Sequence, residues 1–359
     1  MATRFHTPGV RVNGKTREKF HRDLTAWYRR HHRPLPWRAT RDPYRIWVSE
    51  IMLQQTRVDV VRGYYRRWLR AFPTVNALAR APVHRAVKLW EGLGYYSRAR
   101  NLHRAARVLA RQHRGRLPDT VEALMALPGI GRYTAGAIAS IAFSRRVPLV
   151  DGNVARVFAR VFGVTGDVTK PATQKLFWAA AESLVPEKDP GTFNQALMEL
   201  GALVCTPAHP RCGLCPLRRV CVAFKKGKQE ELPNRGRPRA PLRVSHDAAW
   251  VRRGPRFLLQ KRPATGLLAG MWELPSLDRN SLRRGRELLT LRHSITHRRI
   301  TLRVFEGRLP ARLKRGDNLR WFTPAQSNRV TLPAAHRRAL EQCLQRSAAG
   351  RTVPGGRQG

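Results

Sequence analysis

The stretch Leu127-Pro-Gly-Ile-Gly-Arg-Tyr-Thr-Ala135, followed at a distance by Val150-Asp-Gly-Asn153, decides the fold that we expect. Pro128 cannot continue a preceding helix, because it lacks an amide donor and crowds the turn before it. Gly129 and Gly131 permit backbone conformations that other residues avoid, and the small residues that follow give the next helix a close-packing face. The stretch therefore predicts a helix, a tight turn and a second helix.

The start of that second helix also favours a phosphate. Its first amides have no partner within the helix, and the positive end of the helix dipole lies there. Asp151 follows the helix and can project toward the same region, where it can also cap the next helix. An ordinary pair of helices joined by a glycine turn has the same spacing, so the glycines alone leave both readings open.

The charge balance points to nucleic acid. Of 359 residues, 69 are Lys or Arg and 23 are Asp or Glu, which gives a formal net charge of +46. Such an excess is typical of proteins that bind a polyanion with strong salt dependence, although an arginine-rich composition contributes to it. The sequence shows no signal-peptide run and no stretch approaching a membrane span, so we expect a cytoplasmic, nucleoid-associated bacterial protein without membrane contact.

A carboxylate stands in an otherwise apolar helix near the N-terminus. The periodicity predicts a helix over residues 44–57, and Glu50 lies within its apolar run. A carboxylate is rarely buried without a partner, and a surface position on an amphipathic helix is the simpler reading.

Four of the five cysteines can close around one metal centre. Cys205, Cys212, Cys215 and Cys221 are separated by six, two and five residues. This composition alone permits either tetrahedral zinc or an iron–sulfur cluster, and it is unlike a secreted disulfide framework. Cys343 lies apart from the others, and we expect an idle or buried thiol there.

Together these motifs resemble the base-excision DNA glycosylases related to endonuclease III. The 127–135 turn with Asp151 is similar to their helix-hairpin-helix and catalytic aspartate. Bifunctional members carry at the position of Tyr133 a lysine that forms a Schiff base, which a phenol cannot do. Tyr133 and the segment Ser49–Thr56 instead resemble the adenine DNA glycosylases of the MutY family, which act without that nucleophile.

The resemblance assigns roles to residues of this chain. It implies that Glu50 protonates the leaving adenine at N7, that ionised Asp151 stabilises the sugar cation, and that Tyr133 and Asn153 orient them. It also implies that Tyr95, in the glycine-rich segment 92–98, wedges into the base stack. The substrate- or DNA-contacting residues expected besides these are Leu35, Trp37, Arg38, Gln55, Gly129, Gly131 and Gln195. The six-two-five cysteine spacing resembles the loop that holds one [4Fe-4S] cluster in this superfamily.

The C-terminal part resembles a Nudix-like domain. The run 260–275 is similar to the opening of that domain in the MutY family, where it reads 8-oxoguanine, and the Glu-rich metal-binding series of Nudix hydrolases is missing from the sequence. The family's Phe-Ser-His loop aligns with Ile295-Thr296-His297, so that a hydroxyl and an imidazole are kept and the stacking phenyl is replaced. An ordinary hairpin is the alternative reading of this loop.

The expected fold class is α+β with two domains. We expect a disordered N-terminus over 1–16, a helical glycosylase domain over 17–224 with the cluster loop at 205–221, and a basic linker over 225–243. A Nudix-like domain over 244–346, with strands and a last helix near 333–345, and a disordered tail over 347–359 follow. 

The expected function is a monomeric, monofunctional glycosylase of base excision repair, acting on adenine opposite 8-oxoguanine or guanine in double-stranded DNA. The alternatives are a bifunctional endonuclease III-like glycosylase with lyase activity and a non-catalytic DNA-binding protein stapled by a metal. The first alternative needs a lysine at position 133, where this chain has a tyrosine.

Overall fold

The computed structural model describes residues 14–236, 240–277, 283–308 and 318–349. The chain divides into two compact units, Met1–Ala81 with Arg100–Arg237, and Pro82–Ala99 with Pro238–Gly359. Three of the expected segments lie partly outside the described residues: the N-terminus at 1–13, the basic linker at 237–239 and the tail at 350–359.

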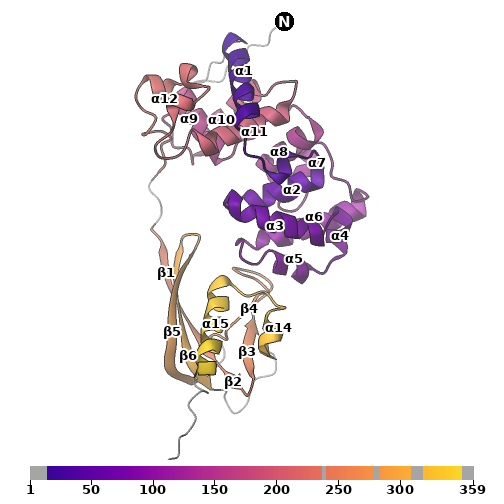
Figure 1. Cartoon of the computed structure of the whole chain (residues 1–359), viewed down its shortest axis with the longest axis vertical. Coiled ribbons are helices and arrows are strands. Elements are labelled where there is room, and N and C mark those ends of the chain that lie inside the picture. The colour runs from indigo at the N-terminus through magenta and orange to yellow at the C-terminus, as the bar shows by residue number, and fades with distance from the viewer. Residues whose placement is uncertain (1–13, 237–239, 278–282, 309–317, 350–359) are drawn as a thin grey trace, which may run out of the picture. The chain divides into compact units, whose positions relative to one another are not determined.

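The first unit is helical (Figure 1). Most of α6 belongs to this unit, and only the first turn of α6 falls in the second one. The helices are α1 (Gly14–His31), α2 (Pro43–Leu53), α3 (Val58–Ala71), α4 (Val75–Arg80), α6 (Ser97–Gln112), α7 (Val121–Met125), α8 (Arg132–Phe143), α9 (Gly152–Phe162), α10 (Pro171–Leu184), α11 (Pro190–Leu203) and α12 (Val222–Lys225), with the short 3-10 turns η1 (Pro36–Arg38), η2 (Cys212–Leu214) and η3 (Arg218–Val220).

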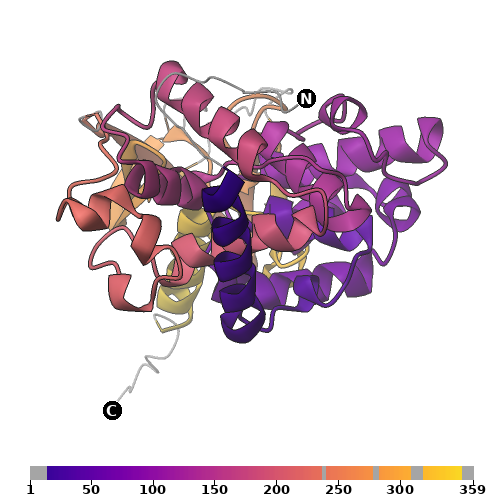
Figure 2. The same cartoon turned by 90° about the horizontal axis from the view of Figure 1, so that it is seen from above.

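One core of this unit forms where α1, α9, α10 and α11 meet. The predicted apolar face of α1 is buried, with Phe20 and Leu24 at 1% and 0% exposure, and it packs along α11 (Figures 1 and 2). Phe158, Phe177 and Phe193 come from the other three helices and are fully buried in the same cluster. This packing holds the start of α9, where Asp151 lies, against α11.

The helix that carries Glu50 is shorter than its periodicity predicts. α2 ends at Leu53, and the expected continuation to position 57 is wrong. Gln54 leaves helical geometry with ψ 110°, and Gln55 adopts the left-handed region with φ 55°. The Thr56 amide donates to the Leu53 carbonyl at 3.3 Å, so the chain reverses in a tight turn. Hydrophobic periodicity continues through this turn and therefore does not reveal it.

The second unit combines α5 (Val83–Leu89) with two sheets and two C-terminal helices. In the first sheet β1 (Leu242–Trp250) runs parallel to β6 (Arg298–Arg308), which forms an antiparallel hairpin with β5 (Arg283–Ile295). In the second, β3 (Arg256–Lys261) pairs with β2 (Arg252–Arg253), β4 (Trp272–Glu273) and β7 (Leu319–Phe322). The helices are α14 (Pro324–Ser327) and α15 (Ala334–Ala349).

The core of the second unit lies between α15 and the strands (Figure 1). Leu302 and Val304 of β6 and Ala339 and Leu340 of α15 are all buried there, together with Cys343 at 1% exposure. The predicted strands and final helix are present, and α15 runs four residues beyond its expected end at 345. The two-residue strands β2 and β4 were not predicted, because they are too short to show periodicity.

Among the described residues, none of the helices combines the length and the apolar character needed to cross a bilayer.

Candidate active site

Glu50 is buried inside the first unit. Asp42 starts α2 by accepting the Tyr44 and Arg45 amides at 2.8 and 3.1 Å, and Pro43 takes the first helical position. The helix is buried along much of its length, and Glu50 is 5% exposed. The surface reading of this residue is therefore wrong, and the carboxyl group needs a partner or a proton.

Tyr133 supplies that partner from the first turn of α8. Its hydroxyl donates to Glu50 Oε2 at 2.6 Å and lies 3.2 Å from the sulfur of Met198. The phenol itself is held neutral, because burial and the Glu50 charge raise the pKa of Tyr133 well above its usual range.

Asp151 sits at the N-cap of α9, as the sequence predicts. Its carboxylate accepts the Val154 amide at 2.7 Å and the Asn153 side-chain amide at 2.9 Å. Asn153 in turn accepts from Arg156 at 2.8 Å, and Arg156 also donates to the carbonyl of Cys205 at 2.7 Å. A continuous series of hydrogen bonds therefore orients this carboxylate from the cysteine loop.

The two carboxyl groups have unlike pKa environments. Burial raises the pKa of Glu50 to about 7, and the charge of Asp151 raises it as well, although the Tyr133 hydroxyl opposes both. Burial also raises the pKa of Asp151, but the Val154 amide and Asn153 counteract it by donating hydrogen bonds to the ionised form. The arrangement suits a protonated acid at position 50 and an anion at position 151 near neutral pH.

Both groups line one cavity of about 620 Å³. The volume exceeds that of a water cluster and accommodates a drug-sized or nucleotide-sized group. Of the residues predicted to contact substrate, those that line the same cavity are Leu35, Trp37, Arg38, Gln55 and Gln195, in addition to Tyr133 and Asn153.

An ion-pair network at the cavity wall was not predicted. Glu199 of α11 is 1% exposed and accepts from Arg33 Nη2 at 2.6 Å and from Arg38 Nη2 at 2.7 Å. Burial alone would raise the pKa of Glu199, but hydrogen bonds from Arg38 and Arg33 lower it to about 2. The available signal was the same as for Glu50, a lone carboxylate in an apolar helix.

Three further residues that line the cavity were not predicted from the sequence. Arg156 and Met198 belong to helices, and Arg235 reaches the cavity from the basic segment that follows the cysteines. Two of the three are cations, so the cavity joins an acid and an anion to positive charge suited to a phosphate.

The turn before α8 has the predicted form. Gly129 has φ 82°, and a Cβ there would lie 2.6 Å from Asn101, so only glycine fits. Gly131 is the N-cap of α8, with open space at its Cβ position and no side-chain cap. Neither residue lines the cavity, and the amides that follow them at the helix start suit an anion.

Tyr95 lies in the second unit on a tight glycine loop. Gly92 and Gly94 have φ 103° and 72°, and Tyr95 itself adopts φ 47° with 44% of its surface exposed. Arg98 holds the loop by donating to the carbonyls of Leu93 and Gly94 at 3.1 and 3.2 Å. Tyr95 is therefore available to contact a partner from solvent.

Thr296 and His297 occupy the tip of the β5–β6 hairpin. Both are exposed, and Thr296 has φ 54° with its hydroxyl donating to the Ile295 carbonyl at 2.7 Å. Ile295 is half-buried and lines a separate cavity of about 220 Å³.

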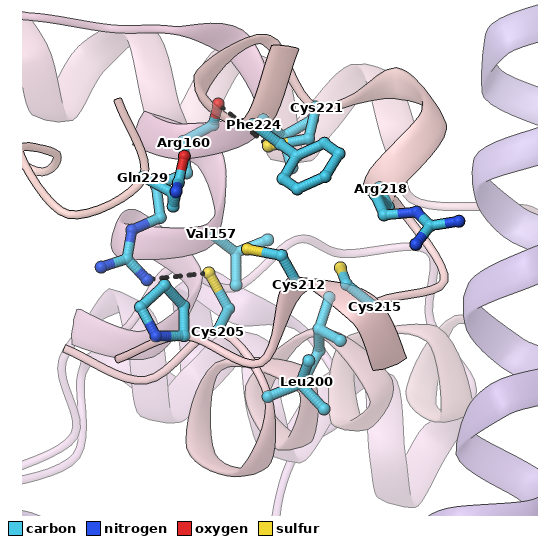
Figure 3. Close-up of a pocket in the computed structure, with 13 residues that line it drawn as sticks. Val157, Arg160, Leu200, Cys205, Cys212, Cys215, Arg218, Cys221, Phe224 and Gln229 are labelled. Atoms are coloured by element: carbon cyan, nitrogen blue, oxygen red, sulfur yellow. Dashed lines mark hydrogen bonds between the residues drawn. The ribbon is translucent and has the colours of Figure 1, made fainter. Parts of the chain in front are cut away.

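The four clustered cysteines line a single pocket (Figure 3). Cys212 lies in η2, Cys221 lies between η3 and α12, and Cys205 follows α11. Arg160, 1% exposed, donates to Cys205 Sγ at 3.3 Å (Figure 3). Its guanidinium also donates to the carbonyls of Thr206, Pro207 and Leu232. Four sulfur donors with a hydrogen bond to one sulfur fit either tetrahedral zinc or an iron–sulfur cluster.

A second group of possible ligands, His246, Glu273 and His336, does not suit a metal. The Leu274 amide donates to His336 Nδ1 at 3.2 Å, so the neutral ring carries its proton on Nε2, which faces Glu273 Oε2 at 3.4 Å. Burial lowers the pKa of His336 well below its usual range, which keeps the ring neutral. Arg262 donates to the same Glu273 oxygen at 2.6 Å, and its charge opposes a cation.

Comparison with known proteins agrees with both units. A family model for HhH-GPD superfamily base excision DNA repair proteins matches residues 48–183, and a NUDIX domain model matches residues 247–342. A thermostable thymine-DNA glycosylase of known structure is 32% identical with a TM-score of 0.54, over 59% of this chain and 98% of that one. The helix-hairpin-helix glycosylase fold and the Nudix-type domain predicted from the sequence are confirmed.

Curated relatives narrow the family. The adenine DNA glycosylase of Rattus norvegicus is 41% identical over 310 residues, which are 72% of this chain and 60% of that protein. The adenine DNA glycosylase of Homo sapiens is 35% identical over 400 residues, which are 89% of this chain and 73% of that protein. The chain thus spans less than two thirds of the rat relative but nearly three quarters of the human one. This chain, which brings Glu50, Asp151 and Tyr133 to one cavity, belongs to the adenine DNA glycosylase family.

Proposed function

We propose that the chain is a monofunctional glycosylase that hydrolyses the N-glycosidic bond of adenine mispaired with 8-oxoguanine or guanine in duplex DNA. The observation that carries the proposal is the placement of Glu50 and Asp151 on one cavity of about 620 Å³, with a protonated and an ionised environment respectively. A purine reaches such a cavity only after it leaves the base stack.

Glu50 acts as the general acid. Its pKa near 7 leaves a large fraction of the carboxyl protonated at neutral pH, and the proton passes to N7 of the extruded adenine. Protonation makes the purine a better leaving group, and the N-glycosidic bond breaks toward an oxocarbenium-like sugar. Asp151 stabilises that cation, and water completes the hydrolysis.

Tyr133 makes the enzyme monofunctional. Its phenol is neutral and already donates to Glu50, and it has no amine with which to form a Schiff base at the sugar carbon. The reaction therefore stops at the abasic site, and strand cleavage is not expected.

The β5–β6 hairpin reads the base opposite the adenine. Thr296 and His297 are exposed at its tip and offer a hydroxyl and an imidazole to the lesion, whereas half-buried Ile295 contributes packing rather than stacking. The excess of 69 basic over 23 acidic residues supplies the attraction to the DNA backbone.

Cys205, Cys212, Cys215 and Cys221 would hold one [4Fe-4S] cluster, which is supported by their all-sulfur donor set and the hydrogen bond from Arg160 to Cys205. A closed cluster supplies rigidity to the surrounding basic loop rather than a reacting group. The chain of contacts from Cys205 through Arg156 to Asn153 then keeps Asp151 in position.

The test compares three duplexes that place adenine opposite 8-oxoguanine, guanine or thymine, with free adenine and strand breaks measured separately. We expect release from the first two and no breaks. Glu50→Gln should abolish release while duplex binding persists, and the exposed Glu122→Gln should behave as the unaltered protein. Normal turnover by Glu50→Gln would remove the acid role, strand nicking would favour the lyase, and a colourless preparation without adenine release would favour a zinc-stapled binding protein.

A further inference from the structure

A partly buried ion-pair network in the second unit joins two segments that are far apart in the sequence. Glu91 Oε1 accepts from the Leu332 amide at 3.2 Å and from Arg337 Nη2 at 3.1 Å. The side chains of Glu91 and Arg337 are 20% and 18% exposed. Charge-assisted hydrogen bonds of this kind, shielded from solvent, are among the stronger polar contacts in proteins.

Both ends of the network are fixed by further bonds. Arg337 Nη2 donates to the carbonyls of Val330 at 2.9 Å and Ser327 at 3.2 Å, so its guanidinium cannot turn away. Lys88 pairs with Glu91 and donates to the Val330 carbonyl at 3.0 Å. Glu91 and Lys88 thus join the C-terminal end of α5 to the segment before α15.

Glu91 directly precedes the loop that presents Tyr95. From within, the loop is tied by Trp90 Nε1, which donates to the Gly94 carbonyl at 3.1 Å, and by Arg98. These bonds give the loop its internal shape but do not attach it to the sheet. Glu91, through Leu332 and Arg337, and Lys88, through Val330, attach the chain on the N-terminal side of the loop to the rest of the second unit.

On the other side, Arg337 belongs to α15, which packs against β5. β5 ends at Ile295, immediately before Thr296 and His297. A path of direct contacts therefore leads from the Tyr95 loop through Glu91 and Arg337 to the hairpin tip.

We propose that Glu91 and Arg337 form a latch that holds the Tyr95 loop at a fixed position relative to the β5–β6 hairpin, and so makes adenine removal selective for the opposite base. The inference rests on the proposed function. When the hairpin tip finds its target, the latch places Tyr95 at the step beside the mispair; with the latch open, Tyr95 inserts independently of the opposite base. Glu91 and Arg337 are positioning residues, because neither touches substrate.

The first test needs neither DNA nor activity. Hydrogen exchange of the 92–97 amides is measured in the free full-length protein and in Glu91→Gln, Arg337→Gln and Arg338→Gln. Arg338 is the matched control, an exposed arginine next to Arg337 on the same helix. Loss of a shielded, charged hydrogen bond should speed exchange of these amides roughly tenfold in the first two variants. Exchange that is unchanged in both, or equally faster in the control, would overturn the latch.

The second test measures selectivity as the ratio of adenine release opposite 8-oxoguanine to release opposite guanine. This ratio should fall by roughly tenfold in Glu91→Gln and Arg337→Gln, stay unchanged in Arg338→Gln, and recover in part in the charge-swapped pair Glu91→Arg with Arg337→Glu. A merely structural role would lower both rates in proportion and leave the ratio unchanged. If the unaltered protein releases no adenine, the proposed function fails, and the exchange experiment still decides whether the latch exists.

Discussion

Two carboxyl groups, of buried Glu50 and half-buried Asp151, share one cavity, and hydrogen bonding separates their roles. Glu50 has one protein donor, the Tyr133 hydroxyl, whereas Asp151 accepts from the Val154 amide and from Asn153. Each donor favours the ionised form, so the Val154 amide and Asn153 oppose the rise that desolvation causes in the pKa of Asp151. The number of donors that each carboxyl group meets therefore favours Glu50 as the acid and Asp151 as the anion.

The first prediction concerns the pH dependence of adenine release. Because the acid must be protonated, release should fall as the pH rises through about 7, the pKa of Glu50. The Tyr133 hydroxyl stabilises ionised Glu50, so Tyr133→Phe should raise that pKa and move the alkaline limb upward by about one unit. Single-turnover rates from pH 5 to 9 provide the measurement.

Tyr28→Phe is the control for this prediction. Tyr28 is also buried beside the cavity, but its hydroxyl donates to Gln195 at 3.2 Å and not to Glu50. The alkaline limb of the pH profile of Tyr28→Phe should coincide with that of the unaltered protein. An inflection that stays in place or moves downward in Tyr133→Phe would contradict the assigned direction of the Tyr133 hydrogen bond.

At this scale the sequence predicts residues better than it predicts their partners. The resemblance of short motifs to a family identifies Glu50 and Asp151, and the structure brings both to one cavity together with Tyr133. Glu199 was not predicted, because its partners Arg33 and Arg38 lie 166 and 161 residues away from it in the sequence. No local periodicity carries that information.

At the scale of the element, α11 is tied to the N-terminal segment by this buried ion pair. Glu199→Gln would leave Arg33 and Arg38 without their counter-charge, and breaking a buried pair from one side typically costs about 3–5 kcal/mol. We expect a comparable loss in the free energy of unfolding, measured by denaturant titration. The control is Glu187→Gln, which removes an ion pair with Arg146 in which the Glu187 side chain is 83% exposed. This change should alter the free energy of unfolding by less than about 0.5 kcal/mol.

The ion pairs of Glu199 also predict the direction in which stability changes with pH. The folded-state pKa of Glu199 is lowered to about 2 from 4.5, so its contribution is complete above the unfolded value and is lost as the pH falls between these two values. The stability difference between the unaltered protein and Glu199→Gln should therefore narrow on acidification through that window. A difference that stays constant would contradict the assignment.

Helix α8 depends on a close backbone approach that only glycine allows. A Cβ at Gly136 would lie 2.3 Å from the Pro148 carbonyl oxygen, in the segment that leads to Asp151. Gly136→Ala should therefore destabilise the protein and slow adenine release by displacing this segment. Gly63 of α3 has open space at its Cβ, so Gly63→Ala should stabilise by about 0.5–1 kcal/mol through helix propensity. Thermal unfolding and release rates decide the contrast, and equal effects would refute it.

The presence of the helices and strands was easier to predict than the residues at which they begin and end. The long helices and strands follow hydrophobic periodicity, whereas the end of α2 at Leu53 depends on a turn at Gln54 and Gln55 that periodicity does not register. That turn places Gln55 on the cavity wall. The residue was identified by resemblance to a family, and its backbone geometry became visible only in the structure.

At the scale of the whole molecule, the units are not simple halves of the chain. The segment Pro82–Ala99 groups with the C-terminal residues, because Glu91 and Lys88 bond to positions near 330. Side-chain pairing over such a separation leaves no trace in composition or periodicity.

The last prediction concerns the charge of the whole chain. Each lysine or arginine that neutralises a DNA phosphate releases a condensed counterion, so affinity falls with rising salt in proportion to the number of contacts. With a net charge of +46, we expect binding to an undamaged duplex to weaken at least about 1000-fold between about 50 and 200 mM salt. Fluorescence anisotropy at several salt concentrations gives the slope. On a duplex with adenine opposite 8-oxoguanine, Arg235→Gln should lower the slope by about one, because exposed Arg235 lines the cavity and is placed to bind a phosphate of the extruded nucleotide. A shallow dependence in the unaltered protein would mean that the excess charge reflects composition rather than DNA contact.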